Sequence, residues 1–243
     1  MRVARAYWEE SRSHRYSLVF ALPLLLLYEL LEALAPVRMG GGVVRNGADV
    51  ILTGLFTAAF GPRGPMIFMA LVIGGALVLI WRDRRAGPIR PYYFALMLAE
   101  SIVLAMLFGA VVGLATVQLL GPLRSLAAGV PGFSATPLER LTLSLGAGLY
   151  EELLFRVVLV ALLSNVLRLG GFSRLTAGAF AVIVGALLFS AFHYIGAFGE
   201  PFRLESFVFR AVAGVAFSAM YLLRGFGITA WTHALYDVAV LLG

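Results

Sequence analysis

The sequence predicts an all-α protein: a polytopic bundle of transmembrane helices with about seven spans and one short interfacial or re-entrant helix. Three observations support this class. The 243 residues are 61% hydrophobic and only 13% charged, whereas an ordinary globular chain carries roughly 25% charged residues. Disorder is excluded because disordered chains combine low hydrophobicity with high charge. Finally, long apolar runs are separated by short connections that carry most of the arginines.

The charge and cysteine content exclude several classes of function. The chain contains no cysteine, so it has no disulfide framework, thiolate metal site or cysteine nucleophile. The formal net charge is +6, and all 19 basic residues are arginine. They lie in short connections between apolar runs and not in a stripe on a polar surface, so they indicate membrane topology and not nucleic-acid binding. The expected partners are membrane lipids and a membrane-associated substrate, with no nucleic acid.

The first apolar segment, 16–35, follows a polar arm with four arginines. It resembles a signal peptide because Ala33 and Ala35 form an A-x-A-like site. Glu29 and Glu32 interrupt its apolar region and Pro36 follows the site, so the segment is expected to be retained as a span.

The next segment, 49–60, has about a dozen apolar residues, whereas a span needs about 20. It is therefore predicted to be the interfacial or re-entrant helix. The remaining predicted spans are 66–81, 91–120, 138–169, 173–198, 204–223 and 228–242. Gly170 and Gly171 are the expected stop of the 138–169 helix.

The arginine distribution predicts one orientation. The arm at 2–15, the cluster at 82–90, the pair Arg168 and Arg174, and Arg224 all fall on one side. By the positive-inside rule the N-terminus is cytoplasmic, and the expected location is the bacterial inner membrane. No repeat or soluble domain is visible, so residues 1–243 are interpreted as a single domain with a motif-bearing core at 138–243.

The ionisable residues inside the spans are the candidate functional residues, because a charge in hydrocarbon is costly. Glu151, Glu152 and Arg156 lie in the middle of the 138–169 span. Glu152 and Arg156 are at i and i+4 and can pair on one face, which leaves Glu151 without that partner and suited to act as a general base. The alternative is a buried Glu–Arg clamp that only holds helices together, and it accounts for Glu152 and Arg156 better than for Glu151.

Two histidines add to this set. Phe189 and His193 share a helical face, so the ring could pack against the imidazole. His233 and Asp237 are also at i and i+4, where a carboxylate can fix the tautomer of the imidazole. Taken alone, each histidine could equally be a polar contact between helices. Together with Glu151 they supply a base, a proton donor and an oxyanion stabiliser, the parts that let water attack a peptide carbonyl.

These motifs resemble the CPBP intramembrane protease family, which includes the CAAX prenyl endopeptidases and the bacteriocin-immunity proteins. The resemblance rests on Glu-Glu-x-x-x-Arg from Glu151, Phe-x-x-x-His from Phe189 and His-x-x-x-Asp from His233, in that order on late helices. It covers about the C-terminal half of the chain. It implies an intramembrane endopeptidase in which Glu151 activates water beside His193, His233 and position 237 stabilise the oxyanion, and Glu152 and Arg156 support the site.

Position 237 departs from the family pattern, since the prenyl-processing members typically have Asn there. An ionised Asp cannot donate a hydrogen bond to an oxyanion, so Asp237 is either protonated or orients His233. This departure weakens the expectation of a prenylated substrate. A transmembrane or lipid-adjacent segment of another membrane protein is the more natural one, with C-terminal processing or sorting as one form of the reaction.

Zinc is the less favoured alternative cofactor. Two His and two Glu could ligate it, and Glu151, His193 and His233 would then be the ligands. However, zincin motifs place two His and the Glu on one helix, whereas these histidines lie on separate helices. A site without metal or other cofactor is the favoured expectation.

Two other classes remain open. A proton-coupled transporter could use Glu29, Glu32, Glu100 and Arg210 along a polar path, although the sequence has no inverted repeat. A non-enzymatic membrane scaffold of the immunity type could keep the fold without catalysis. The intact set of motifs favours the enzyme, because a scaffold has no need of it.

Overall fold

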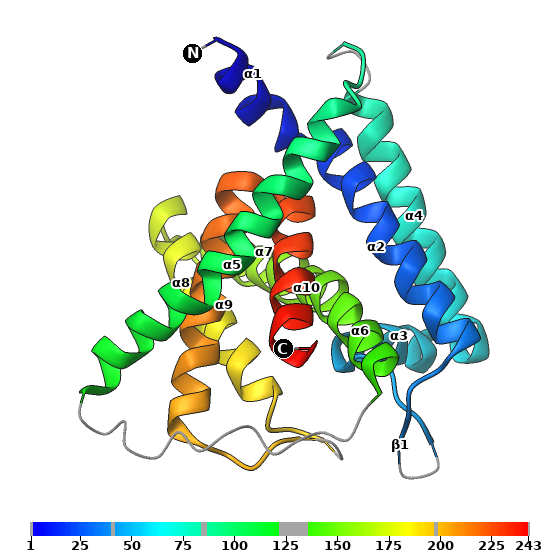
Figure 1. Cartoon of the computed structure of the whole chain (residues 1–243), viewed down its shortest axis with the longest axis vertical. Coiled ribbons are helices and arrows are strands. Elements are labelled where there is room, and N and C mark those ends of the chain that lie inside the picture. Colours follow the sequence, from blue (N-terminus) through cyan, green and yellow to red (C-terminus); the bar gives the residue numbers. More distant parts are fainter. Residues whose placement is uncertain (1, 40–41, 84–86, 122–135, 197–198, 243) are drawn as a thin grey trace.

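The computed structural model describes residues 2–39, 42–83, 87–121, 136–196 and 199–242, and its regular structure is almost entirely helical (Figure 1). The expected all-α membrane bundle is confirmed. Much of the connection between the predicted spans 91–120 and 138–169, and Arg84 and Arg85 of the basic cluster, lie outside the described residues.

The N-terminal half holds a basic arm, three long helices and one short one. Its elements are α1 (Arg2–Ser11), α2 (His14–Leu34), β1 (Arg38–Met39), β2 (Gly42–Val43), α3 (Gly47–Phe60), the 3₁₀ turn η1 (Gly61–Arg63), α4 (Gly64–Arg82) and α5 (Tyr92–Leu120). The two short strands pair antiparallel. The predicted short helix is present as α3, which runs across the direction of α4 (Figure 1).

The C-terminal half begins with one long helical stretch that is partly π-helical. It consists of α6 (Pro137–Gly146), the π segments η4 (Ala147–Glu151) and η5 (Leu153–Val160), and α7 (Ala161–Leu169). It is followed by α8 (Arg174–Phe192), α9 (Leu204–Arg224) and α10 (Phe226–Leu242). The predicted stop is confirmed, since α7 ends at Leu169 and Gly171 has a φ of +89°.

Fewer helices than predicted have the length and composition of a membrane span. Five segments qualify among the described residues, and not seven: His14–Leu34, Gly47–Arg82, Tyr92–Leu120, Arg174–Phe192 and Leu204–Arg224. The predicted spans 138–169 and 228–242 do not qualify. The first carries buried charges and is divided by π turns, and α10 has 17 residues, about 26 Å of helix against a hydrocarbon core of about 30 Å.

Helix α10 lies at the centre of the bundle (Figure 1) and packs against α2, α5, α6, η4 and α9. Its approach to η4 depends on a residue without a side chain. A Cβ at Gly148 would lie 2.4 Å from the carbonyl oxygen of Ala230 and 2.7 Å from the Cβ of Ala234. The absence of that Cβ lets α10 contact the segment that carries Glu151 and Glu152.

Candidate active site

The candidate site lies where the π segments, the end of α8 and the middle of α10 meet. Glu151 ends η4, and Glu152 follows it as the residue between the two π segments. Single π turns inside α-helices are rare and frequently occur at functional sites. His193 caps the C-terminus of α8, and His233 and Asp237 lie on α10.

Glu152 is the fully buried centre of an ion cluster. Its Oε1 lies 3.1 Å from Nη1 of Arg156, so the pair predicted from the i, i+4 spacing is present. The same oxygen lies 2.8 Å from Nδ1 of His233. Because a carboxylate only accepts, Nδ1 of His233 carries the hydrogen. The contact between Glu152 and His233 was not predicted, since they are 81 residues apart.

Arg156 is held by aromatic rings as well as by Glu152. Its guanidinium carbon lies 4.4 Å from the ring centre of Phe189 and 5.3 Å from that of Phe217. Phe217 also stacks on His233, with ring centres 4.3 Å apart. Phe217 was missed from the sequence because a phenylalanine in an apolar span gives no signal of its own.

Glu151 has a partner that the sequence did not predict. It was expected to lack one, but Nδ2 of Asn46 donates to its Oε1 at 3.0 Å. Its other oxygen, Oε2, is buried and has no hydrogen-bond partner among the described residues. Asn46 lies 105 residues away in the N-terminal half. In the sequence, Asn46 is visible as a polar residue before an apolar helix. This N-cap pattern predicts where a helix begins and does not predict a contact with Glu151.

His193 is connected to the ion cluster of Glu152 through the ring of Phe189. Its ring contacts Phe189 at 5.0 Å, as the shared helical face predicted, and Phe189 in turn lies 6.1 Å from the ring of His233. The predicted span 173–198 ends at Phe192 instead, because the chain leaves the helix and turns at Gly196, where φ is +93°. This turn leaves His193 at the helix end.

The tautomer of His193 follows from its backbone contact. Its Nδ1 lies 2.9 Å from the carbonyl oxygen of Phe189, and a carbonyl only accepts, so Nδ1 carries the hydrogen. Burial lowers the pKa of His193, while the nearby Glu151 carboxylate acts in the opposite direction. The ring is therefore neutral near pH 7, and its Nε2 has a free lone pair.

Asp237 makes a looser contact than expected. Its Oδ2 lies 3.6 Å from Nε2 of His233, which is beyond hydrogen-bond distance. The ring of His233 thus lies between two carboxylates, with the hydrogen bond going to Glu152. Asp237 has the neighbour that the spacing predicted, without the direct bond.

The zinc alternative requires its three candidate ligands to be arranged around a metal ion. Among the described residues, no group of three or more His, Asp or Glu side chains is arranged to hold a metal ion. In both histidines the hydrogen bond engages Nδ1, to a backbone carbonyl at His193 and to Glu152 at His233, so Nε2 is the ring nitrogen that a ligand would meet. Glu151, His193 and His233, the ligands of the zinc alternative, do not form such a group among the described residues.

The residues of the transporter alternative are dispersed into separate pairs. Glu29 accepts from Arg45, Glu100 accepts from Arg224, and Arg210 donates to Glu200. These contacts lie on different pairs of elements, so Glu29, Glu100 and Arg210 do not form one continuous polar path.

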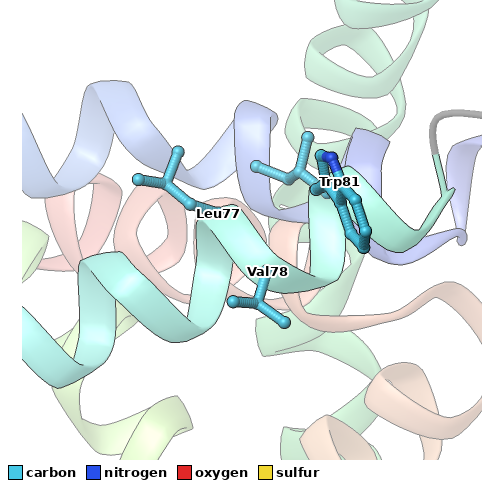
Figure 2. A pocket seen from close by; sticks show the side chains of 4 residues that line it. Leu77, Val78 and Trp81 are labelled. Carbon is cyan, nitrogen blue, oxygen red and sulfur yellow. The ribbon is translucent and has the colours of Figure 1, made fainter.

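A shallow depression on α4 has a different character (Figure 2). It is lined by Leu77, Val78, Ile80 and Trp81, and its lining carries no ionisable group. Leu77, Val78 and Trp81 are more than half exposed, which suits contact with acyl chains and not catalysis.

Comparison with known proteins locates a family match in the same part of the chain. Residues 133–239 match the family model described as type II CAAX prenyl endopeptidase Rce1-like. The match contains all three motifs and excludes Asn46. No curated protein and no solved structure matched the chain.

Proposed function

We propose that this membrane protein, whose residues 133–239 match the CAAX prenyl endopeptidase family model, is an endopeptidase in which Glu151 activates the attacking water. The substrate is a membrane-associated peptide, either a transmembrane segment or a lipid-anchored tail. The reaction is hydrolysis within the bundle, without a metal cofactor.

The asymmetry of Glu151 is the observation that carries this proposal. One carboxylate oxygen is bound by Asn46, and the other is buried without a partner among the described residues. A general base needs an oxygen that can take a proton from water. The carbonyl of Phe189 holds the hydrogen of His193 on Nδ1, so its Nε2 can accept a second hydrogen bond from that water.

The chemical steps follow from these groups. Water adds to the peptide carbonyl carbon while one of its protons moves to Oε2 of Glu151. The carbonyl oxygen becomes an oxyanion, and a protonated His233 donates from Nε2 to stabilise it, with Glu152 and Asp237 offsetting the ring's charge. Glu151 then returns the proton to the leaving nitrogen as the C–N bond breaks, which yields a carboxyl group and an amine.

The orientation of the site is part of the same proposal. Three arginine-bearing segments meet at one end of the bundle, because Arg90 binds Glu10 and Arg224 binds Ser11. The positive-inside rule places that end in the cytoplasm. The N-terminus is then cytoplasmic, in the inner membrane of a bacterium.

The test is a comparison of membrane proteomes. A strain lacking the protein is complemented with wild type, Glu151→Gln or Glu9→Gln, and peptide ends are identified by mass spectrometry. Glu151→Gln is expected to lose the cleaved ends seen with wild type, a fall in rate of at least about 100-fold. Glu9→Gln makes the same chemical change at an exposed surface pair and retains cleavage.

Two results would overturn the proposal. Full cleavage by Glu151→Gln would show that Glu151 is not the general base. Loss of cleavage by the purified protein on chelation, restored by added zinc, would replace it with a metal-dependent reaction.

A further inference from the structure

We propose that Asn46 is a positioning residue for the general base: its amide fixes Oε1 of Glu151 and directs Oε2 toward the water. This inference rests on the proposed function and adds a residue from outside the family match. Asn46 lies at the start of α3, far from the late motifs in sequence, and its contact with Glu151 links the two halves of the chain at the site.

The direction of the hydrogen bond is fixed by the other end of the same amide. Oδ1 of Asn46 accepts from the backbone N–H of Ala48 at 2.9 Å, as an N-cap side chain does. A flipped amide would set two donors against each other at Ala48 and two acceptors against each other at Glu151. Nδ2 therefore faces the carboxylate, and Asn46 is its donor.

The position of Asn46 is also fixed. The residue is buried, with 7% of its surface exposed, and its backbone N–H donates to the hydroxyl of Tyr28 at 3.3 Å. A Cβ at Gly146 would lie 2.5 Å from the Tyr28 ring and 2.9 Å from Cβ of Asn46. The helix that leads to Glu151 thus contacts the Asn46 segment through a glycine.

Arg45, the residue before Asn46, is joined through Glu29 to Tyr150, which lies on η4 directly before Glu151. Nη2 of Arg45 donates to both carboxylate oxygens of Glu29 at 3.0 Å. The hydroxyl of Tyr150 donates to Glu29 at 2.6 Å. Because Tyr150 precedes Glu151 and Arg45 precedes Asn46, Glu29 links the two neighbours of the interacting pair. The amide is held before substrate binds, as preorganised catalytic groups are.

The structural role of Asn46 as a cap can be separated from its role at Glu151. Asn46→Asp keeps a good N-cap, and its ionised carboxylate has no hydrogen to donate to Glu151. Asn46→Ala removes both functions. Ser173→Ala removes the cap of α8, where Ser173 accepts from Thr176, without any contact to Glu151, and serves as the control for loss of a cap alone.

The kinetic test uses the purified full-length protein and an internally quenched peptide copied from a site that wild type cleaves in the membrane proteome. Asn46→Asp is expected to lower kcat about 10- to 100-fold, the effect of losing a hydrogen bond to a charged group, with KM little changed. Ser173→Ala is expected to keep kcat. An unchanged kcat in Asn46→Asp, with Glu151→Gln inactive, would overturn the positioning role and leave the proposed function standing.

A second measurement does not need activity. The infrared carboxylate bands of Glu151 are those that disappear in Glu151→Gln. They are expected to shift in Asn46→Ala and to stay in place in Ser173→Ala. If the bands do not move in Asn46→Ala, the inference is contradicted even if no peptide is cleaved. If the bands shift but no peptide is cleaved, the result supports the contact and counts against the proposed function.

Discussion

Glu151 and Glu152 are adjacent in the chain, yet their carboxylates have different surroundings. Glu152 faces a guanidinium and an imidazole, and both lie within 3.1 Å of its Oε1. Among the described residues, the hydrogen-bond partner of Glu151 is the neutral amide of Asn46. A buried charge needs a paired charge or several hydrogen bonds. Glu152 is thus held as part of an ion cluster, while Glu151 keeps an oxygen available for chemistry.

This difference predicts different costs for the same substitution at the two positions. Glu152→Gln leaves the buried guanidinium of Arg156 without its counter-charge, and breaking a buried pair in this way costs about 3–5 kcal/mol of the free energy of unfolding. Glu151→Gln removes no paired charge and is expected to cost under about 1 kcal/mol. Denaturant-induced unfolding in detergent micelles measures both variants, and equal losses would contradict this account of the ion cluster.

At the residue scale, the sequence predicted contacts within one helix and missed those between helices. The Glu152–Arg156 and Phe189–His193 contacts follow from helical spacing, which fixes the face of each residue. The contacts of Glu152 with His233 and of Glu151 with Asn46 depend on which helices become neighbours. Spacing along the chain contains no information about that choice. The catalytic roles themselves stay predictions.

The element that organises the site is the helical stretch from α6 to α7 with its two π segments. It passes α10 closely at Gly148, just before the two glutamates, where a Cβ would overlap the backbone of Ala230. His233 lies on the same part of α10. The distance between the two elements therefore sets the distance between Glu152 and His233.

Gly148→Ala is expected to separate η4 from α10 and weaken the contact between Glu152 and His233. The cost of such overpacking is about 1–3 kcal/mol in stability, together with a fall in kcat because His233 moves. The control is Gly113→Ala on α5, where a Cβ would meet nothing within 4 Å. Thermal unfolding and peptide cleavage measure both variants, and wild-type behaviour of Gly148→Ala would contradict the close packing described.

Element boundaries were predicted well where local signals end a helix, as at Gly171. They were predicted poorly where apolar residues continue past the helix end. Tyr194 and Ile195 read as part of a span, but the chain turns at Gly196. Hydropathy measures affinity for an apolar environment and not backbone conformation, so an apolar residue such as Ile195, which is 70% exposed, can lie in a turn beyond the helix end.

On the scale of the whole molecule, the buried Arg224 joins several helices at the basic end of the bundle. Arg224 donates to Glu100 through Nε at 2.6 Å, to the backbone of Trp8 and to Ser11. Tyr7 donates to Glu100 as well. Burial raises the pKa of Tyr7, and its bond to Glu100 raises the pKa further, so the phenol keeps its proton at neutral pH. Helices α1, α5 and α9 are joined at this point.

Arg224→Gln is expected to release α1 from the bundle, because Glu100 loses its counter-charge and Trp8 loses its cation. The expected cost is on the order of 3 kcal/mol, seen as faster proteolysis within residues 2–11 of the detergent-solubilised protein. Arg5→Gln, which breaks only an exposed pair with Glu9, is expected to leave proteolysis unchanged. Equal cutting of wild type and Arg224→Gln would show that α1 is held by other contacts.

Composition and spacing alone determined that this chain is a helical membrane protein and that its late motifs resemble a protease. Hydrophobic content is a property of the whole composition, and it determines whether the chain prefers a membrane to water. The i, i+4 spacing is a local pattern, and it determines which residues share a helical face. Only the tertiary structure decided the number of span-length helices, the placement of His233 between Glu152 and Asp237, and the contact of Asn46 with Glu151. Each of these depends on which helices pack together, and close approach at Gly146 and Gly148 makes that packing possible.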